Sequence, residues 1–234
     1  MPSDIPVVGF LIILLVLSGC TGTSSKSTTF SVNDKGELTL TCAPVTTTEE
    51  ELFANETCTR SRIVFHTGNG DIVSYLGAPE HPKAAVVYSP GAGEKLSGHE
   101  ERMVRFATAG YAFLFVDTRG NGGENAGIPF GQQLIQQDYA RFGKGEMPQY
   151  YLSICDLVLA QEMLSEKYNV PVYAIGSSNG GRYAAVAAGT DPAFAGYVGI
   201  STSDWGLLDS IAQQGITGGP VQFATSLEPG TYIG

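Results

Sequence analysis

The sequence predicts an α/β fold in which a mostly parallel sheet is covered on both faces by helices. Short apolar runs at 84–89, 111–117, 170–176 and 196–201 show no polar alternation, which is typical of strands buried on both faces. Helical patterns alternate with these runs, as they do in a parallel sheet. The chain has 234 residues, of which 43% are apolar, and this is enough to bury the core of such a three-layer domain.

The first elements of this domain are a hairpin and a strand that leads into a loop. In 62–76, two strands flank the sequence Thr-Gly-Asn-Gly-Asp, whose residues tolerate the positive φ of a hairpin turn. The run 84–89 is followed by glycines and then by a helical stretch over about 99–109. We therefore expect the strand 84–89 to end in a tight loop in front of that helix.

The later elements include the clearest helix of the chain, which spans 150–169. Pro148 precedes it, and Asn169 with Pro171 ends it. Its inward positions follow the i, i+3, i+4, i+7 spacing of a helix, and they are Ile154, Leu157, Val158, Gln161 and Leu164. The run 170–176 is followed by an alanine-rich segment that permits a second, closely packed helix before the last strand.

Residues 1–20 predict export and attachment to the membrane. An apolar run at 7–17 is too short to cross a bilayer as a mature helix. The ending Leu-Ser-Gly-Cys resembles a prokaryotic lipobox, in which a signal peptide at 1–19 is removed and Cys20 is lipidated. An uncleaved N-terminal anchor is the alternative, and either one places the rest of the chain outside the cytoplasm, in the cell envelope. Residues 20–29 then form a Ser/Thr-rich tether.

Residues 30–60 follow as a polar N-terminal extension in which we predict no core element, and the α/β domain occupies 61–234. Two interpretations stay open for the cysteines of the extension. An oxidising exterior favours a Cys42–Cys58 disulfide, which would restrain a poorly buried segment, and the alternative is that this disulfide does not form. We expect Cys155, within the predicted long helix, to be a buried small hydrophobic residue.

Composition and glycine spacing argue against two classes of partner. The chain has 23 acidic and 13 basic residues, a net charge of −10, and no cluster of Lys or Arg that would follow a phosphate backbone, so we expect no nucleic-acid partner. The glycine-rich segment 90–98 lacks the spacing of glycines and lysine found in nucleotide-binding loops. We expect no cofactor and no metal.

The sequence Gly-Ser-Ser-Asn-Gly at 176–180 matches the G-x-S-x-G pattern, with Ser178 at its centre. A match this short has little weight in a chain with 30 glycines. Its position has more weight, since it follows a predicted buried strand and begins a predicted helix, where a nucleophile elbow belongs. The flanking glycines permit a strained turn that lifts the serine hydroxyl above the sheet at the helix N-terminus.

From about residue 60 to 205 the chain resembles the α/β-hydrolase family, in particular its dienelactone-hydrolase and prolyl-oligopeptidase-like branches. The similar segments are VVYSPGAG at 86–93, FVDTRGNGG at 115–123 and AIGSSNGG at 174–181. The resemblance implies ester or peptide hydrolysis, in which Ser178 attacks the carbonyl carbon of a small-molecule or peptide acyl substrate.

The resemblance also assigns roles to residues around the serine. The backbone N–H groups of Asn179 and of Ala92 or Gly93 would hold the oxyanion. Asp117 and Arg119 would support the geometry of the turn after their strand rather than act in catalysis.

The usual partners of a catalytic serine are harder to place. The serine needs a base, and in this family an acid and then a histidine follow it in the sequence, whereas His66, His81 and His99 all precede Ser178. We expect all three histidines to be exposed loop or helix-start residues, with His99 as the weak candidate for the base. Asp204, after the last predicted strand, is the weak candidate for the acid.

Two hypotheses follow for the whole chain. The first is a serine hydrolase that is truncated before its last strands, C-terminal helix and histidine, and is therefore nearly inactive. The second is an extracytoplasmic binding or structural domain that keeps the fold without the chemistry. We favour the first, because a sheet that ends on the strand 196–201 exposes an apolar edge that a binding domain would be expected to protect.

Overall fold

The computed structural model describes residues 27–204 and 206–232. The predicted signal peptide at 1–19, the lipidation site Cys20 and the start of the tether lie outside the described residues. Within the described part of the chain, no helix has both the length and the apolar character needed to span a membrane.

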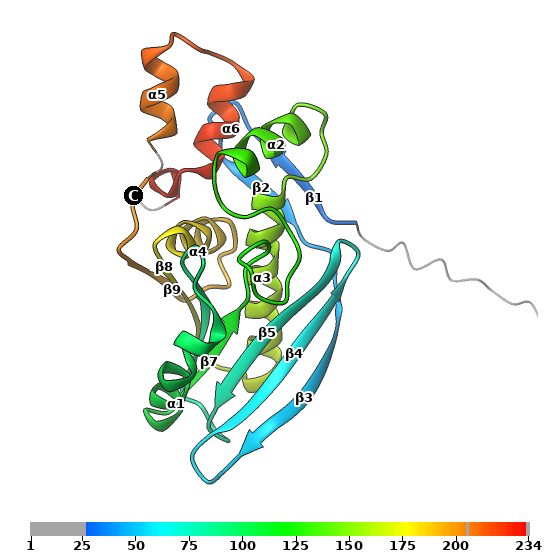
Figure 1. Cartoon of the computed structure of the whole chain (residues 1–234), viewed down its shortest axis with the longest axis vertical. Helices are drawn as coiled ribbons and strands as arrows, with labels where there is room; N and C mark the ends of the chain where they lie inside the picture. Colours follow the sequence, from blue (N-terminus) through cyan, green and yellow to red (C-terminus); the bar gives the residue numbers. More distant parts are fainter. Residues whose placement is uncertain (1–26, 205, 233–234) are drawn as a thin grey trace, which may run out of the picture.

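A seven-stranded sheet forms the centre of the domain (Figure 1). Its strands are β3 (Thr46–Ala54), β4 (Thr59–Thr67), β5 (Gly70–Ala78), β6 (Ala84–Ser89), β7 (Tyr111–Val116), β8 (Val172–Ser177) and β9 (Gly196–Ile200), in the spatial order β3-β4-β5-β7-β6-β8-β9. β7, β6, β8 and β9 pair in parallel, and β5 pairs antiparallel with both β4 and β7. β4 thus runs in the same direction as the parallel group, so the predicted mostly parallel sheet is confirmed.

Helices cover both faces of this sheet (Figure 1). They are α1 (Glu100–Thr108), α2 (Gln132–Phe142), α3 (Gln149–Tyr168), α4 (Asn179–Thr190), α5 (Leu207–Gln213) and α6 (Gly219–Leu227), with short 3₁₀ turns η1 (Leu96–Gly98) and η2 (Pro229–Thr231). α3 and α4 pack on one face, and α1 packs on the other. The hairpin, the long helix and the strand ends therefore agree closely with those predicted from the sequence.

The strand β7 shows why the central runs are apolar throughout. Ala112, Leu114 and Val116 face the large cluster that includes residues of α3 and α4, while Phe113 and Phe115 face a smaller cluster with α1. Successive side chains of a strand point to opposite faces, so a strand covered on both sides needs apolar residues at every position. The predicted three-layer arrangement is confirmed.

β9 forms an edge of the described sheet, beside β8. Val198 and Ile200 are 49% and 44% exposed. Tyr197, on the other face, donates its hydroxyl hydrogen to the carbonyl oxygen of Gly181 in α4 at 3.0 Å. The exposed apolar strand predicted at 196–201 is therefore present, and its covered face is attached to the helix that follows Ser178.

Residues 30–60 contain regular structure, so the prediction that they hold no core element was wrong. β1 (Thr29–Val32) and β2 (Leu38–Thr41) form a small antiparallel sheet, and β3 follows them. The ring of Phe30 lies 5.1 Å from the ring of Tyr151 in α3, and Leu38 is buried. Strands of four residues are too short for their alternation to stand out in the sequence, and these two are stabilised by packing against α3.

The predicted Cys42–Cys58 disulfide was also wrong. Cys42, just after β2, is bonded to Cys155 of α3, with 5.6 Å between their Cα atoms. Cys58, next to β4, is a buried free thiol. The cause is tertiary: β2 packs beside α3, and a disulfide requires that the two Cα atoms lie within about 7 Å. Cys155 is therefore a cross-link rather than a simple apolar core residue.

Buried polar contacts hold the turn after β7. One carboxylate oxygen of Asp117 accepts the backbone N–H groups of Glu124 and Asn125 at 2.6 and 3.2 Å. Arg119 forms a two-point ion pair with Asp156 of α3 at 2.8 and 3.0 Å. Both side chains thus support the turn, as the family resemblance implied.

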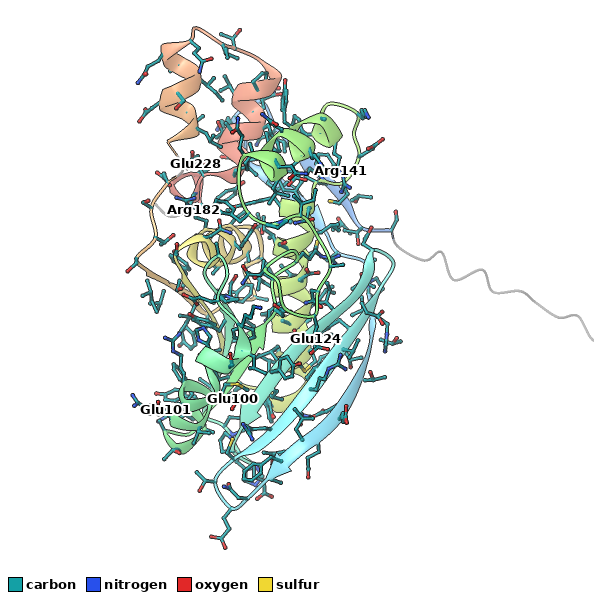
Figure 2. All side chains as sticks on the ribbon, viewed as in Figure 1. Glu100, Glu101, Glu124, Arg141, Arg182 and Glu228 are labelled. Atoms are coloured by element: carbon teal, nitrogen blue, oxygen red, sulfur yellow. A yellow bond between two sulfur atoms is a disulfide. The ribbon has the colours of Figure 1, made fainter. Side chains whose placement is uncertain are left out.

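Glu124 extends this network to the antiparallel strands. Its carboxylate lies beside β5 and β4 (Figure 2), where it pairs with Arg62 at 2.7 Å and accepts the hydroxyl of Tyr75. The turn after β7 is therefore bonded to the sheet as well as to α3, and it is held in place next to the loop that follows β6.

We expect Cys42→Ser to lower the free energy of unfolding by about 2–4 kcal/mol, because the cross-link spans a separation of 113 residues in the unfolded chain. Urea unfolding under non-reducing conditions measures this loss. Cys58→Ala, which leaves the disulfide intact, is the control and should keep most of the stability. Peptide mapping should find Cys42 linked to Cys155, and a peptide that links Cys42 to Cys58 would contradict the assignment.

We expect Asp156→Asn to lower the free energy of unfolding by about 3 kcal/mol, because it leaves the buried Arg119 guanidinium without its charged partner. Glu166→Gln, at an exposed position of the same helix, is the control and should change stability by less than about 0.5 kcal/mol. Equal losses in both variants, measured by denaturant unfolding, would show that the ion pair has no special role.

Candidate active site

Ser178 forms the turn between β8 and α4. Its backbone angles are φ 49° and ψ −120°, a combination that residues other than glycine rarely adopt. Its side chain is exposed at the start of α4. This is the strained strand-to-helix turn expected from the G-x-S-x-G pattern, and the role of Ser178 as a nucleophile stays a prediction.

Glycines let three segments meet beneath this serine. A Cβ atom on Gly176 would clash with the backbone of Gly180, and one on Gly180 would clash with the carbonyl oxygens of Ser89 and Pro90. The end of β6 therefore touches the first turn of α4 directly. On the other side, the backbone N–H of Ser178 donates to the carbonyl oxygen of Ile200 at the end of β9, at 2.8 Å.

The loop after β6 lies next to this turn, and it holds the predicted oxyanion donors. The N–H of Gly93 donates to the Oδ1 atom of Asn121 at 2.6 Å, so this N–H is already used. In the part of the chain that the structure describes, no hydrogen bond occupies the N–H of Ala92. Asn179 is the first residue of α4, and N–H groups at that position have no acceptor within the helix. Of the predicted donors, Ala92 and Asn179 therefore remain.

Glu94 accepts hydrogen bonds from several segments of the site. Its Oε1 atom accepts the hydroxyl of Ser177 at 2.8 Å. Its Oε2 atom accepts the N–H of Gly91 at 3.1 Å and the hydroxyl of Tyr88 at 3.3 Å. Burial raises the pKa of Glu94. The hydrogen bonds from Ser177 and Gly91 and the charge of His99 lower it, and together they outweigh burial, so the pKa of Glu94 lies below its usual value.

His99 is buried, so the expectation of an exposed helix-start residue was wrong. It is 5% exposed at the start of α1, and its ring lies 5.0 Å from that of Tyr88 and 5.1 Å from that of Phe115. The aromatic side chains of the sheet cover it, which the sequence around residue 99 does not reveal. Burial, and next the positive charge of Arg102, lower the pKa of His99, while Glu94 opposes the shift.

The ring of His99 contacts a carboxylate rather than the predicted nucleophile. Its Nε2 atom lies 3.1 Å from Oε2 of Glu94, and among the described residues no hydrogen bond joins it to Ser178. The other histidines lie elsewhere: His66 contacts Asp71 in the β4–β5 hairpin, and His81 is exposed beside Glu80. The described contacts therefore connect Ser178 to none of the three histidines.

Asp204, the weak candidate for the acid, has a structural partner. Its Oδ1 atom accepts the N–H of Gly230 at 3.1 Å, at the turn η2. Arg182 of α4, which points toward the C-terminal segment in Figure 2, donates to the carbonyl oxygens of Ser203 and Asp204 at 2.6 and 3.2 Å. The carboxylate thus holds the C-terminal segment, and no described contact brings it to a histidine.

Three polar residues of the site, Glu94, Asn121 and Ser177, were not predicted from the sequence. Nothing in the local pattern marks these polar side chains as inward-facing, because each is oriented by partners from another segment. The available signal was Glu94 itself, an acidic residue in a glycine-rich loop next to a predicted oxyanion hole. In the described chain, no group of three or more His, Cys, Asp or Glu side chains is placed to hold a metal ion.

Comparison with known proteins identifies similar sequences and folds. The family model described as serine aminopeptidase, S33, matches residues 80–212. No curated protein sequence matches the chain. Among solved structures, the acetyl xylan esterase from Paenibacillus sp. R4 is 18% identical, with a TM-score of 0.56, over 76% of this chain and 60% of that one.

Two further structures are similar at low identity. Acetyl xylan esterase 1 from Thermoanaerobacterium sp. JW/SL YS485 is 14% identical, with a TM-score of 0.56, over 79% of this chain and 69% of that one. A dienelactone hydrolase from Anabaena variabilis ATCC 29413 is 20% identical, with a TM-score of 0.45, over 62% and 64% of the two chains. The chain spans 60% of the length of the Paenibacillus esterase.

We expect the stability of the folded chain to fall between pH 7 and pH 5 through His99. The pKa of His99 in the folded chain lies below the ordinary value of 6.5. As the pH falls below about 6.5, the imidazole is therefore protonated more readily in the unfolded chain, and this protonation stabilises the unfolded chain relative to the folded one. In urea unfolding at several pH values, His99→Gln should lose this part of the pH dependence. His81→Gln, at an exposed position, should keep it, and identical profiles for His99→Gln and the unmodified chain would contradict the assignment.

Proposed function

Because the chain belongs to the serine aminopeptidase S33 family, we propose that it is built for serine-dependent acyl hydrolysis with Ser178 as the nucleophile. Its fold is that of the α/β hydrolases, and esterases are among its structural neighbours. The substrate class that we propose is an ester of a small acyl group, as in the acetyl esterases, with peptide hydrolysis as the finer alternative that the family description suggests.

The observation that carries this proposal is the backbone of Ser178. A serine at φ 49° costs on the order of 1–3 kcal/mol in backbone strain, and the surrounding glycines and β9 hold it there. The strain gives an exposed hydroxyl at the N-terminus of α4, where the free N–H groups and the helix dipole favour a developing anion. Ser201 has the same φ but no helix begins directly after it, so the combination of the strained turn with the start of α4 distinguishes Ser178.

The chemistry that we propose has two steps. The hydroxyl oxygen of Ser178 bonds to the acyl carbonyl carbon, the carbonyl oxygen takes the negative charge, and the N–H groups of Asn179 and Ala92 stabilise that charge. The alcohol then leaves with a proton and an acyl-serine remains. In the second step water attacks the acyl carbon, which releases the carboxylic acid and restores the hydroxyl of Ser178.

Both steps need a base, and this requirement limits the proposed activity. No histidine follows Ser178 in this sequence. Loss of the histidine from a serine protease lowers turnover on the order of 10⁶-fold, so we propose that this chain by itself is weakly active or inactive. We also propose that it acts in the cell envelope, held to the membrane by a lipid on Cys20.

The second candidate function is a non-catalytic binding or structural domain outside the cytoplasm. One observation favours it: the ring of His99 pairs with Glu94 and not with Ser178. A domain that kept the elbow as an inherited turn would show the same contacts. The two functions differ in whether the hydroxyl of Ser178 reacts.

We expect a fluorophosphonate probe to label Ser178 slowly, and we expect imidazole in solution to speed the labelling, because it supplies the base. Peptide mass spectrometry identifies the labelled residue. Ser178→Ala should abolish labelling. Ser201→Ala is the matched control, since Ser201 also has φ 49° at the end of a strand, and it should label as the unmodified chain does.

Three outcomes of this experiment would count against the proposal. Labelling at another serine would reject Ser178 as the nucleophile. Labelling that is absent even with imidazole would favour the binding domain. Rapid labelling without imidazole would show that a working base is already present, and would contradict the proposed weak activity of this chain.

A further inference from the structure

Glu94 connects the loop after β6 to the turn that carries Ser178. We propose that Glu94 is a positioning residue, whose carboxylate holds the 91–94 loop against the end of β8 so that the N–H of Ala92 faces the hydroxyl of Ser178. This inference rests on the proposed function, because it assigns a role in the same oxyanion hole.

The contacts of the two carboxylate oxygens carry the inference. One oxygen accepts the hydroxyl of Ser177 at 2.8 Å, and the other accepts the N–H of Gly91 at 3.1 Å. Ser177 is the residue directly before Ser178, and Gly91 is the residue directly before Ala92. A single carboxylate therefore binds both neighbours of the two groups whose relative position decides whether an oxyanion is stabilised.

The packing around Gly91 leaves little freedom for this loop. A Cβ atom at residue 91 would lie 2.9 Å from Oε1 of Glu94 and 3.1 Å from Oγ of Ser177. The loop backbone thus approaches β8 as closely as a glycine permits. Hydrogen bonds to a charged acceptor are stronger than those between neutral groups, so the carboxylate suits this close contact.

Asn121 has a different function in the same loop. Its side-chain amide donates to the carbonyl oxygens of Gly91 and Glu94 at 3.1 and 2.8 Å and accepts the N–H of Gly93 at 2.6 Å. These bonds attach the loop to the turn after β7, and they hold the residues 91, 93 and 94 around one side chain. Glu94, by contrast, supplies the described side-chain bond between the loop and β8.

Two aromatic side chains support Glu94, one from β6 and one from the residue directly before α1. The hydroxyl of Tyr88 donates to it at 3.3 Å, and Nε2 of His99 lies at 3.1 Å. The buried His99 therefore contacts the site through Glu94 and not through Ser178. Its contact with the carboxylate helps to orient that carboxylate toward Ser177 and Gly91.

Amide hydrogen exchange and fluorophosphonate labelling together test the proposal on the full chain. In Glu94→Ala and Glu94→Gln, we expect the Gly91 amide to exchange about tenfold faster or more, since it loses a hydrogen bond to a charged group. Asn121→Ala should instead speed exchange at Gly93. Glu101→Gln is the matched control, because Glu101 is exposed and pairs with Arg105 on the surface of α1, and it should change neither amide.

Labelling with imidazole present gives the second readout. In both Glu94 variants the maximal rate of bond formation to Ser178 should fall at least tenfold, while the probe concentration for half-maximal rate stays the same, because positioning affects the reaction more than the encounter. A folded Glu94→Gln with unchanged exchange at Gly91 would overturn the proposal. Faster exchange at Gly91 with an unchanged labelling rate would also overturn it, since loosening the loop would then have no effect on the reaction at Ser178.

The two proposals can fail separately. If Ser178 stays unlabelled in the unmodified chain even with imidazole, the proposed function fails and Glu94 has no reaction to position. If the unmodified chain is labelled and the Glu94 variants are labelled equally fast, the proposed function stands and the positioning role is rejected.

Discussion

The site depends on one steric constraint, the direct contact between the end of β6 and the first turn of α4. At Gly180 there is no room for a side chain, because the carbonyl oxygens of Ser89 and Pro90 occupy that space. Any larger residue at position 180 would push the end of β6 away from the first turn of α4. The loop after β6 would then move away from β8, and the hydrogen bond between Glu94 and Ser177 could not form. The chemistry proposed for Ser178 therefore begins with the absence of a Cβ atom two residues further along.

Elements that are defined by local sequence could be predicted, and the reason is visible in β7 and α3. The positions of β7 from Ala112 to Val116 are all buried, because helices cover both faces of the strand, and this produces the continuous apolar run. α3 is long enough for its helical period to appear, and Asn169 ends it in a left-handed conformation. Ser178 was found because the strand, the turn and the helix around it each leave a separate signal.

Features that depend on partners distant in sequence could not be predicted. Cys42 pairs with a cysteine 113 residues away, and no spacing rule selects Cys155 over Cys58. His99 is buried by the rings of Tyr88 and Phe115, although the three residues that follow it in the sequence are charged. The oxyanion loop shows the same limit: its glycines are visible in the sequence, but the contact between Glu94 and Ser177 exists only after β6 and β8 have paired.

The disulfide between Cys42 and Cys155 has a mechanical consequence. When the chain is pulled by its two ends, tension that enters at the N-terminus reaches Cys42 and passes through the sulfur bridge into α3. Residues 43–154, which include β3 to β7, lie in the closed loop and bear no direct load. The force acts on the small β1–β2 sheet and on the segment after Cys155, which contains the serine turn, so an oxidised chain and a reduced chain should extend by different lengths under load.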